Sequence, residues 1–196
     1  MLYVLAAWTG FCRGEIGSLT SKSFNLNSAP PTVRVEAAYS KHRREDVQIL
    51  HPDLVVRLKS WLAVRQPLDD EILVPIGEAS CGVNRKTSKM IQLDLAAARH
   101  VWLREVEESK RAIHESSDFL LYRDHSGRYA DFHALRHTFI TNLCKANVSP
   151  KTAQALPRHS DISLTMNVYT HVDQEEQAVA IGKLPGFLKT LASNQS

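Results

Sequence analysis

Apolar residues near the start of the chain recur at helical spacing. Residues 2–8 are apolar throughout and stop at Thr9-Gly10, which predicts the end of a helix that is already in progress at the first residue. Residues 12–19 follow with helical spacing that turns one apolar side inward. Because the chain opens inside a core helix, we expect it to be cut from a longer protein.

Two stretches alternate between apolar and polar residues, which is the spacing of strands. They cover residues 32–38 and 46–50, and the polar residues 39–45 between them predict the tip of a hairpin. A second, shorter hairpin is expected over residues 118–129, with its turn at Ser126-Gly127. The strands are short, so they predict a small antiparallel sheet.

Helical spacing dominates the rest of the chain. Proline, which favours the first turn of a helix, opens two of the segments, at Pro52 and at Ser149-Pro150. The expected helices cover residues 52–62, 87–107, 132–146, a segment from 149, residues 164–169 and a stretch beyond 173. The sequence therefore predicts a mainly α fold with a small antiparallel β-sheet, in the α+β class.

Length and composition suit one domain. The chain has 196 residues, of which 43% are hydrophobic, enough for one ordinary core and too few for two. We therefore expect a single domain over residues 1–196. The formal net charge of +3 is compatible with a nucleic-acid partner but does not require one, since many enzymes carry as much.

The cysteines and the apolar stretches indicate a reducing, aqueous compartment. Cys12, Cys81 and Cys144 contain no CxxC pair, which argues against a disulfide scaffold or a cysteine zinc site. No apolar stretch approaches the roughly 18 residues of a membrane span, and the N-terminus lacks the pattern of a signal peptide. We expect a cytoplasmic protein without a membrane partner.

The densest group of chemically active residues lies in the run DFHALRHT, residues 131–138. His133 and Arg136 share a helix face at this spacing, where a guanidinium can fork onto two phosphate oxygens while an imidazole donates or shuttles a proton. The alternative for such a pair is a solvated helix surface. His133 and His137 also have zinc-protease spacing, but Ala134 stands where that motif needs a glutamate base, so no metal site is expected.

Two later runs complete an ordered pattern. His159 lies in the run RHSD, and Tyr169 lies in the run LTMNVYTH. HxxR, a later histidine in a (G/R)-H-S context and T-M-x-x-Y-T-H together resemble the C-terminal signature of the tyrosine recombinases, the phage-integrase type of DNA strand-exchange enzyme. The alternative for Tyr169 taken alone is a half-buried core tyrosine.

An upstream hairpin is similar to the same family. The run SKHRREDVQIL over residues 40–50 resembles the family's β-hairpin segment, in which a lysine precedes the closing strand, and the register selects Lys41. The alternative is a solvated basic hairpin tip. The resemblance also implies that basic residues contact DNA, namely Lys41, Arg43, Arg44 and Arg158, the last of which stands where the family has a glycine.

The resemblance implies a tyrosine recombinase catalytic-domain fold and a specific chemistry. Tyr169 would attack a DNA phosphodiester and form a 3′-phosphotyrosyl link. Arg136, His133 and His159 would contact the non-bridging oxygens, and Lys41 would give a proton to the leaving 5′ oxygen. No metal or other cofactor is implied, because arginines take the place of a metal. The implied partner is double-stranded DNA, on which family members act as homo-tetramers.

One position departs from the family pattern. The family's first arginine lies in a T-G-x-R-x-x-E segment, which here is TGFCRGE, and Cys12 stands at the arginine position. A thiol is mostly neutral at pH 7 and cannot supply two fixed positive donors. Arg13 comes one residue after that position, about 100° round a helix, and is expected to point elsewhere. The alternative is that Arg13 bends in and substitutes for the missing arginine. The sequence therefore predicts site-specific DNA recombination or integration that is severely impaired.

A second departure concerns the domain that normally precedes this one. The resemblance begins near Leu2, so the family's N-terminal core-binding domain is expected to be absent. One alternative function is a catalytically inactive DNA-binding remnant of an integrase, which would bind DNA without forming a Tyr169 adduct. Another is a helical interaction module with accidental motif matches, which would not bind DNA even at low salt.

Overall fold

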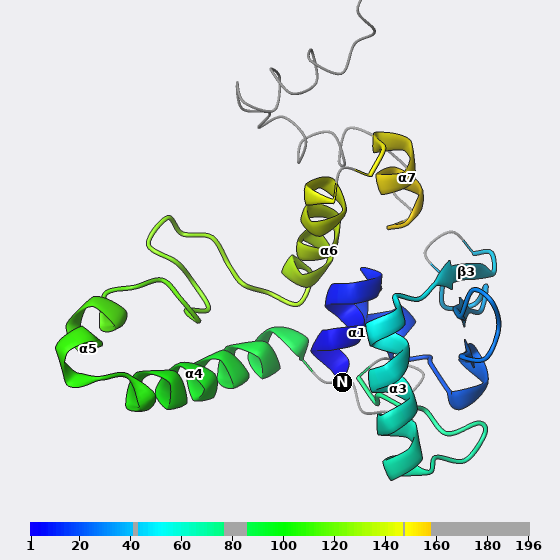
Figure 1. Ribbon diagram of the computed structural model, residues 1–196, viewed down its shortest axis with the longest axis horizontal. Helices are drawn as coiled ribbons and strands as arrows, with labels where there is room; N and C mark the ends of the chain where they lie inside the picture. The colour runs from blue at the N-terminus through cyan, green and yellow to red at the C-terminus, as the bar shows by residue number, and fades with distance from the viewer. Residues whose placement is uncertain (41–42, 77–85, 147, 158–196) are drawn as a thin grey trace, which may run out of the picture.

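The computed structural model describes residues 1–40, 43–76, 86–146 and 148–157, which form a body and an arm (Figure 1). In the body, α1 (Leu2–Thr9) lies in the middle, with the small sheet on one side and α6 (Ala134–Lys145) on the other. The arm consists of α4 (Thr87–Glu105) and α5 (Glu108–Glu115). This arrangement confirms the mainly α fold with a small antiparallel sheet.

The end of α1 is fixed by a glycine. Gly10 has φ 65°, a left-handed conformation, and its N–H donates to the Ala6 carbonyl over 2.9 Å. A Cβ atom at this position would lie only 2.6 Å from Cδ1 of Phe139 on α6. Position 10 therefore requires glycine for two reasons: its left-handed backbone conformation and the close approach of α6 to α1.

The next helix is shorter than expected. α2 covers only Arg13–Ile16, although Ile16 and Leu19 are buried as the helical spacing over residues 12–19 requires. Gly17 ends the helix, which is consistent with the low helix propensity of glycine. A single 3₁₀ turn, η1 (Ser21–Ser23), then leads into the sheet.

The sheet has three antiparallel strands in the order β1 (Phe24–Asn25), β2 (Thr32–Val35) and β3 (Asp46–Ile49). β2 and β3 are the expected pair, joined in a register that sets Val33 opposite Gln48, whereas the two-residue β1 was not predicted.

β3 turns its polar side inward. Val33 and Val35 of β2 bury their side chains, and the register places Gln48 and Asp46 beside them on the same buried face. Val47 and Ile49 are consequently the exposed residues of β3, at 62% and 60%. The alternation indicated a strand correctly, but the apolar positions face the solvent.

α3 (Pro52–Arg65) packs against α1 in the body. The Nδ1 atom of His51 accepts from the Asp53 N–H over 3.2 Å and caps the helix, with proline in the first turn. Leu54, Val55 and Leu58 form the buried stripe, and they belong to the same core as Leu5 of α1. The predicted helix start at Pro52 is confirmed.

The arm was only partly predicted. α4 matches the expected helix over 87–107, but the extended Val106 separates it from α5, which was not predicted. The expected hairpin over 118–129 is a turn at Gly127 with one isolated bridge, between Arg123 and Tyr129, and contains no paired strands.

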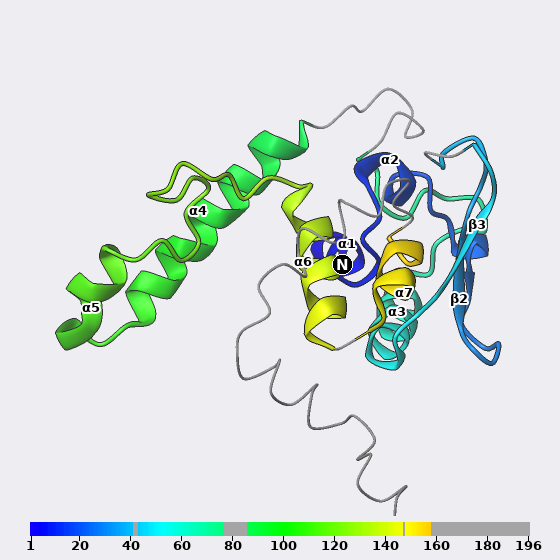
Figure 2. The ribbon, with the colours of Figure 1, turned by 90° about the horizontal axis from the view of Figure 1, so that it is seen from above.

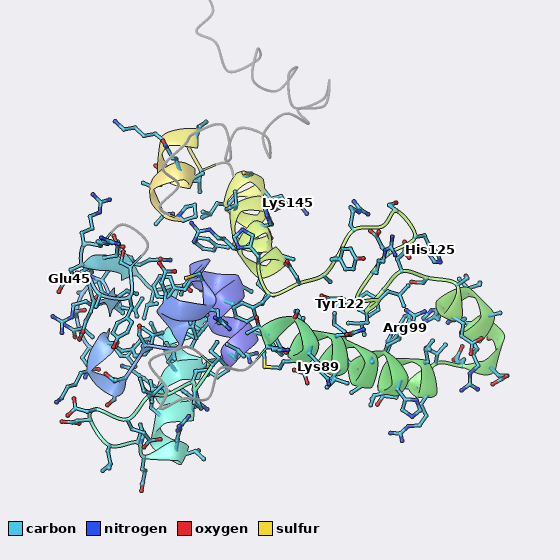
Figure 3. The ribbon with its side chains drawn as sticks, turned by 180° about the vertical axis from the view of Figure 1, so that it is seen from behind. Glu45, Lys89, Arg99, Tyr122, His125 and Lys145 are labelled. Carbon is cyan, nitrogen blue, oxygen red and sulfur yellow. The ribbon has the colours of Figure 1, made fainter. Side chains whose placement is uncertain are left out.

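The tip of the arm is held by one aromatic cluster. The ring of Trp102 stacks on His114 at 4.5 Å between centroids and meets Phe119 edge-on at 4.8 Å. Arg99 reaches from α4 toward the returning segment, where its guanidinium donates to the carbonyls of Glu115, over 2.8 Å, and of Phe119 (Figure 3). This cluster ties α5 to α4 without help from the body.

α6 and α7 (Pro150–Ala155) end the described part of the chain. Ser149 caps α7 by accepting from the Thr152 N–H over 3.3 Å, as its position before proline predicted. The helices expected over 164–169 and beyond 173 lie outside the described residues. In the ranges that the structure describes, no helix combines the length and the apolar character needed to cross a membrane.

Candidate active site

A cavity of about 290 Å³ opens where the first residues of α2, α4 and α6 converge, and these helix starts can be followed in Figure 2. Its lining brings together three of the residues singled out from the sequence, Cys12, His133 and Arg136. The other lining residues are Phe11, Arg13, Thr87, Ser88, Asp131 and Phe132. The starts of the longer helices α4 and α6 add positive partial charge, which favours an anionic ligand.

Arg136 is anchored in the cavity by two hydrogen bonds to backbone carbonyls. Its Nη1 donates to the Gly10 carbonyl over 2.8 Å, and its Nη2 donates to the carbonyl of Pro157. These contacts join the end of α1, the first turns of α6 and the residue pair after α7. Because a guanidinium is planar, two fixed contacts also fix the direction of its whole donor fork.

His133 stands at the N-cap of α6, one residue before the helix begins. Its backbone already has helical angles, φ −72° and ψ −25°, so the expected shared face with Arg136 holds. The start of α6 is capped instead by Asp131, whose Oδ1 accepts from the Ala134 N–H over 2.8 Å. The imidazole is exposed at the rim, and its ring lies edge-on to that of His137 at 5.2 Å.

Cys12 and Glu15 form a reciprocal capping box at the start of α2. The Cys12 N–H donates to Oε2 of the buried Glu15 over 2.7 Å. Burial raises the pKa of the Cys12 thiol, and the Glu15 carboxylate raises it further. The position that holds an arginine in the tyrosine recombinase motif is therefore occupied here by a neutral thiol.

Arg13 lines the same cavity, which differs from the expectation that it points elsewhere. That expectation assumed a helical step between residues 12 and 13. Cys12 is extended, with φ −76° and ψ 170°, and α2 begins only at Arg13, so the 100° rotation of a helix does not apply between them.

The hairpin residues are only partly described. Arg43 and Arg44 are exposed, and the Arg44 Nε lies 3.7 Å from Oδ1 of the buried Asp46, whose Oδ2 accepts from the Ser40 hydroxyl. Arg44 lines a second groove, of about 510 Å³, between β3 and α7. Lys41, Arg158, His159 and Tyr169 lie outside the described residues, so their expected places at the site stay predictions.

Sequence reasoning missed several residues that shape the site. The Gln48 Nε2 donates to the Thr9 carbonyl over 3.1 Å, holding the loop before Cys12 from the side of the sheet. No sign of this contact is present in the sequence, because the alternation of β3 does not indicate that Gln48 faces inward. Thr87 and Ser88 reach the cavity from the distant start of α4, and no local pattern indicates that contact.

No metal site is indicated in the part of the chain that the structure covers. Within those ranges, no group of three or more histidine, cysteine, aspartate or glutamate side chains is arranged to hold a metal ion. The cavity instead combines guanidinium, imidazole and hydroxyl groups, which are the partners of an oxyanion such as a phosphate.

Comparison with known proteins decides the family. Residues 1–176 match the model of the phage integrase family. The chain belongs to that family. In sequence, it is 45% identical over 56 residues to a protein named tyrosine recombinase XerC-like from Caldanaerobacter subterraneus subsp. tengcongensis, a match that covers 29% of this chain and 14% of that relative. It is also 46% identical over 52 residues to a tyrosine recombinase from Pseudothermotoga lettingae, covering 26% and 18%.

Solved structures share the fold of this phage integrase family member. The XerA recombinase superimposes with a TM-score of 0.55 at 19% identity, over 93% of this chain and 55% of that one. The Tn1549 transposon integrase, solved with transposon right end DNA, gives a TM-score of 0.58 at 15% identity, over 93% and 57%. The chain thus spans little more than half the length of these proteins.

Proposed function

We propose that this chain is the catalytic domain of a tyrosine recombinase that cuts and rejoins double-stranded DNA through Tyr169, with a chemical step slowed by Cys12. The observation that carries the proposal is the cavity in which Arg136, His133 and the thiol of Cys12 meet. Family membership over residues 1–176 supports it. Further support comes from two relatives of the same fold, XerH and the Tn1549 integrase, which were solved with difH substrate and with transposon DNA.

In this proposal the reaction consists of two successive transesterifications at one phosphate. The Tyr169 phenol attacks the phosphodiester, loses its proton and releases a 5′ hydroxyl that takes a proton from Lys41. The resulting 3′-phosphotyrosyl bond keeps the energy of the broken bond, so a 5′ hydroxyl of another strand can attack it and free Tyr169. His159 would join the residues that contact the non-bridging oxygens.

The described residues supply the part of this chemistry that acts on the phosphate oxygens. The guanidinium of Arg136 brings a positive charge in a fixed position to the non-bridging oxygens, and His133 at the rim can donate to them or shuttle a proton. No residue here would need to bind a metal for that purpose, because the positive charge comes from side chains.

Cys12 is the reason for a slow chemical step. Its thiol is kept protonated by burial and by Glu15, so it offers neither charge nor a fork of donors to the pentavalent phosphate. Removing one donor from an oxyanion site typically costs about 10²–10³ in rate, and an arginine on a phosphoryl group can be worth more. We therefore propose weak strand cleavage by the natural sequence and much faster cleavage by Cys12→Arg.

Relaxation of supercoiled plasmid tests the proposal, because nicking and closing need no known target site. The natural chain, Cys12→Arg and Cys12→Arg/Tyr169→Phe are compared at low salt, with covalent protein–DNA adducts scored on a denaturing gel. We expect Cys12→Arg to relax the plasmid at least about a hundred times faster than the natural chain and the added Tyr169→Phe to abolish adducts.

Two other results would contradict it. Equal relaxation by the natural chain and by Cys12→Arg would show that position 12 does not limit the rate. DNA binding without relaxation or adducts in all three variants would favour the alternative, a DNA-binding remnant of an integrase.

A further inference from the structure

We propose that the chain forms a weak two-fold dimer through α4 of the arm, with the exposed side of this helix packed antiparallel against the same side of a second copy. The surface is one row of residues four positions apart, which we call the outer ridge: Lys89, Leu93, Ala97, Val101 and Glu105. Pairing through this ridge goes beyond the proposed strand cleavage, because it needs neither DNA nor catalysis.

The outer ridge lies on the side of α4 that the rest of the arm leaves uncovered. All of its residues are exposed, and the two large apolar ones, Leu93 and Val101, have exposed fractions of 60% and 42%. Side chains four residues apart are neighbours on a helix, so the row is continuous. Arg99 is about 200° round the helix from Ala97, and it points toward the returning segment on the opposite side (Figure 3).

The outer ridge is complementary to itself when its direction is reversed. A two-fold axis at Ala97 brings Leu93 of one copy to Val101 of the second, and each such contact occurs twice. The same axis brings Lys89 of one copy to the end of the ridge where the second copy has Glu105. Apolar residues thus meet apolar residues and two cations meet two carboxylates, so a second copy of this chain matches the charge pattern of the ridge.

The centre of the outer ridge allows two helices to approach closely. Ala97 and its neighbours Ala96 and Ala98 are all exposed and small. Rows of this spacing pack side by side in the commonest class of helix contacts, at an interaxial distance set by the side chains at the crossing point. Alanine at that point brings Leu93 and Val101 within reach of the second copy.

The two charges of the outer ridge stand at the ends of α4 where the helix dipole disfavours them. Lys89 lies in the first turn and Glu105 is the last residue, whereas the dipole favours an acidic residue at the start and a basic one at the end. Among the described residues, neither takes part in an ion pair. An antiparallel second copy supplies the opposite charge at both ends and sets the two dipoles in opposite directions.

Sedimentation velocity of the chain without DNA measures the association. A single helix offers less area than a standard protein interface, so the dimer is expected to be weak. Over a dilution series that reaches about 1 mM, we expect a monomer–dimer equilibrium with a dissociation constant between about 1 µM and 1 mM. Added salt should weaken it, because the charge pairs lie at the surface.

Charge reversal identifies the surface. Lys89→Glu and Glu105→Lys each turn two attractive contacts into repulsive ones and should raise the dissociation constant at least about tenfold. Lys89→Glu/Glu105→Lys restores opposite charges and should dimerise like the natural chain. An equimolar mixture of the two single variants should form a heterodimer. Both single changes suit the dipole of α4 better than the natural residues, so weaker pairing would not reflect loss of the helix.

A substitution on the two-fold axis gives a second test. Ala97→Arg sets two guanidinium groups against each other at the centre of the contact and should abolish the dimer. Ala63→Arg makes the same change at an exposed position of α3 and is the matched control, which should leave the dissociation constant unchanged.

A natural chain that stays monomeric over the whole dilution series would overturn the proposal. A dimer that persists unchanged in Ala97→Arg or in the single charge reversals would also overturn it, since that dimer would form through another surface. If the double reversal and the mixture both failed to restore pairing, the antiparallel register would be wrong.

Discussion

Gln48 and Arg136 donate hydrogen bonds to consecutive peptide carbonyls, those of Thr9 and Gly10, over 3.1 and 2.8 Å. Gln48 comes from the buried face of β3 and Arg136 from the first turn of α6, so the two bonds hold the end of α1 from opposite sides. The segment that follows carries Cys12 and Arg13 into the cavity. The position of both residues thus depends on contacts from two distant parts of the chain.

Gln48→Glu should break the contact from the sheet in a pH-dependent way. At pH 8 a buried carboxylate facing the Thr9 carbonyl loses the donor and repels it, which should lower the free energy of unfolding by about 2–3 kcal/mol. Burial raises the pKa of such a carboxyl in the folded state. The variant should therefore be least destabilised below about pH 4.3, where the carboxyl is protonated in both states, and should lose stability as the pH rises through the folded-state pKa.

Urea unfolding at several pH values measures this effect. Gln92→Glu on the exposed side of α4 is the matched control, and its stability should follow that of the natural chain. A pH-independent loss in Gln48→Glu would argue against a buried carboxyl at this position.

Gly10→Ala should be among the most damaging single changes to the body. The left-handed backbone and the 2.6 Å approach of Phe139 to a Cβ atom both oppose it. We expect a loss of about 2–5 kcal/mol in the free energy of unfolding. Gly14→Ala, in α2 with open space around the new methyl group, should instead leave stability unchanged or raise it by up to about 1 kcal/mol. Similar losses in the two variants, measured by urea unfolding, would contradict this account of Gly10.

The titration of Cys12 should be visible in its reactivity. Burial and the charge of Glu15 raise the pKa of the thiol from its ordinary value of 9.0, so its alkylation should begin at higher pH than that of a free thiol. Glu15→Gln removes the charge and keeps a side-chain acceptor for the Cys12 N–H. In that variant the pH midpoint of alkylation should fall; an unchanged midpoint would assign the whole shift to burial.

The same shift has a consequence for stability. Because the folded-state pKa lies above the unfolded value, the protonated thiol stabilises the fold fully below about pH 9. That contribution is lost as the pH rises through the raised pKa. Cys12→Ser should therefore flatten the fall in the free energy of unfolding at alkaline pH, which urea unfolding between pH 7 and pH 11 measures.

Arg99→Ala should loosen the tip of the arm and leave the cavity intact. Arg99 holds carbonyls at the end of α5 and after it, and its guanidinium lies 5.9 Å from the ring centre of Trp102. We expect hydrogen exchange at the amides of α5 to rise about tenfold or more, as for the loss of a 1.4 kcal/mol contact or larger. Arg104→Ala, an exposed change on the same helix, is the control. Faster exchange around Arg136 would show that arm and body are coupled.

The sequence predicted those helices whose ends are marked by residues that act on the adjacent backbone. α1 ends at Thr9-Gly10, α3 begins at Pro52 and α7 begins after Ser149, because glycine, proline and a capping serine act through the backbone next to them. α6 was also foreseen from its apolar stripe, in which Phe139 and Ile140 are buried.

Features that depend on distant contacts were not predictable in this way. Alternation identified β3 but not its buried face, since Gln48 is held inside by a carbonyl of α1 that no local pattern includes. The direction of Arg13 followed from the extended backbone of Cys12 rather than from helix geometry. Three of the lining residues, Cys12, His133 and Arg136, were inferred from motif order, whereas Thr87 and Ser88 join them only through the folded chain.

The bond between Arg136 and Gly10 closes a loop of 126 residues. Closing so long a loop carries a large entropic cost before other contacts repay it, so this bond is expected to form late in folding. Until it forms, the guanidinium fork has no fixed direction and the starts of α2 and α6 are not joined. A chain emerging from the ribosome therefore carries the individual residues of the cavity but not the assembled cavity, and the phosphate site proposed above exists only in the finished fold.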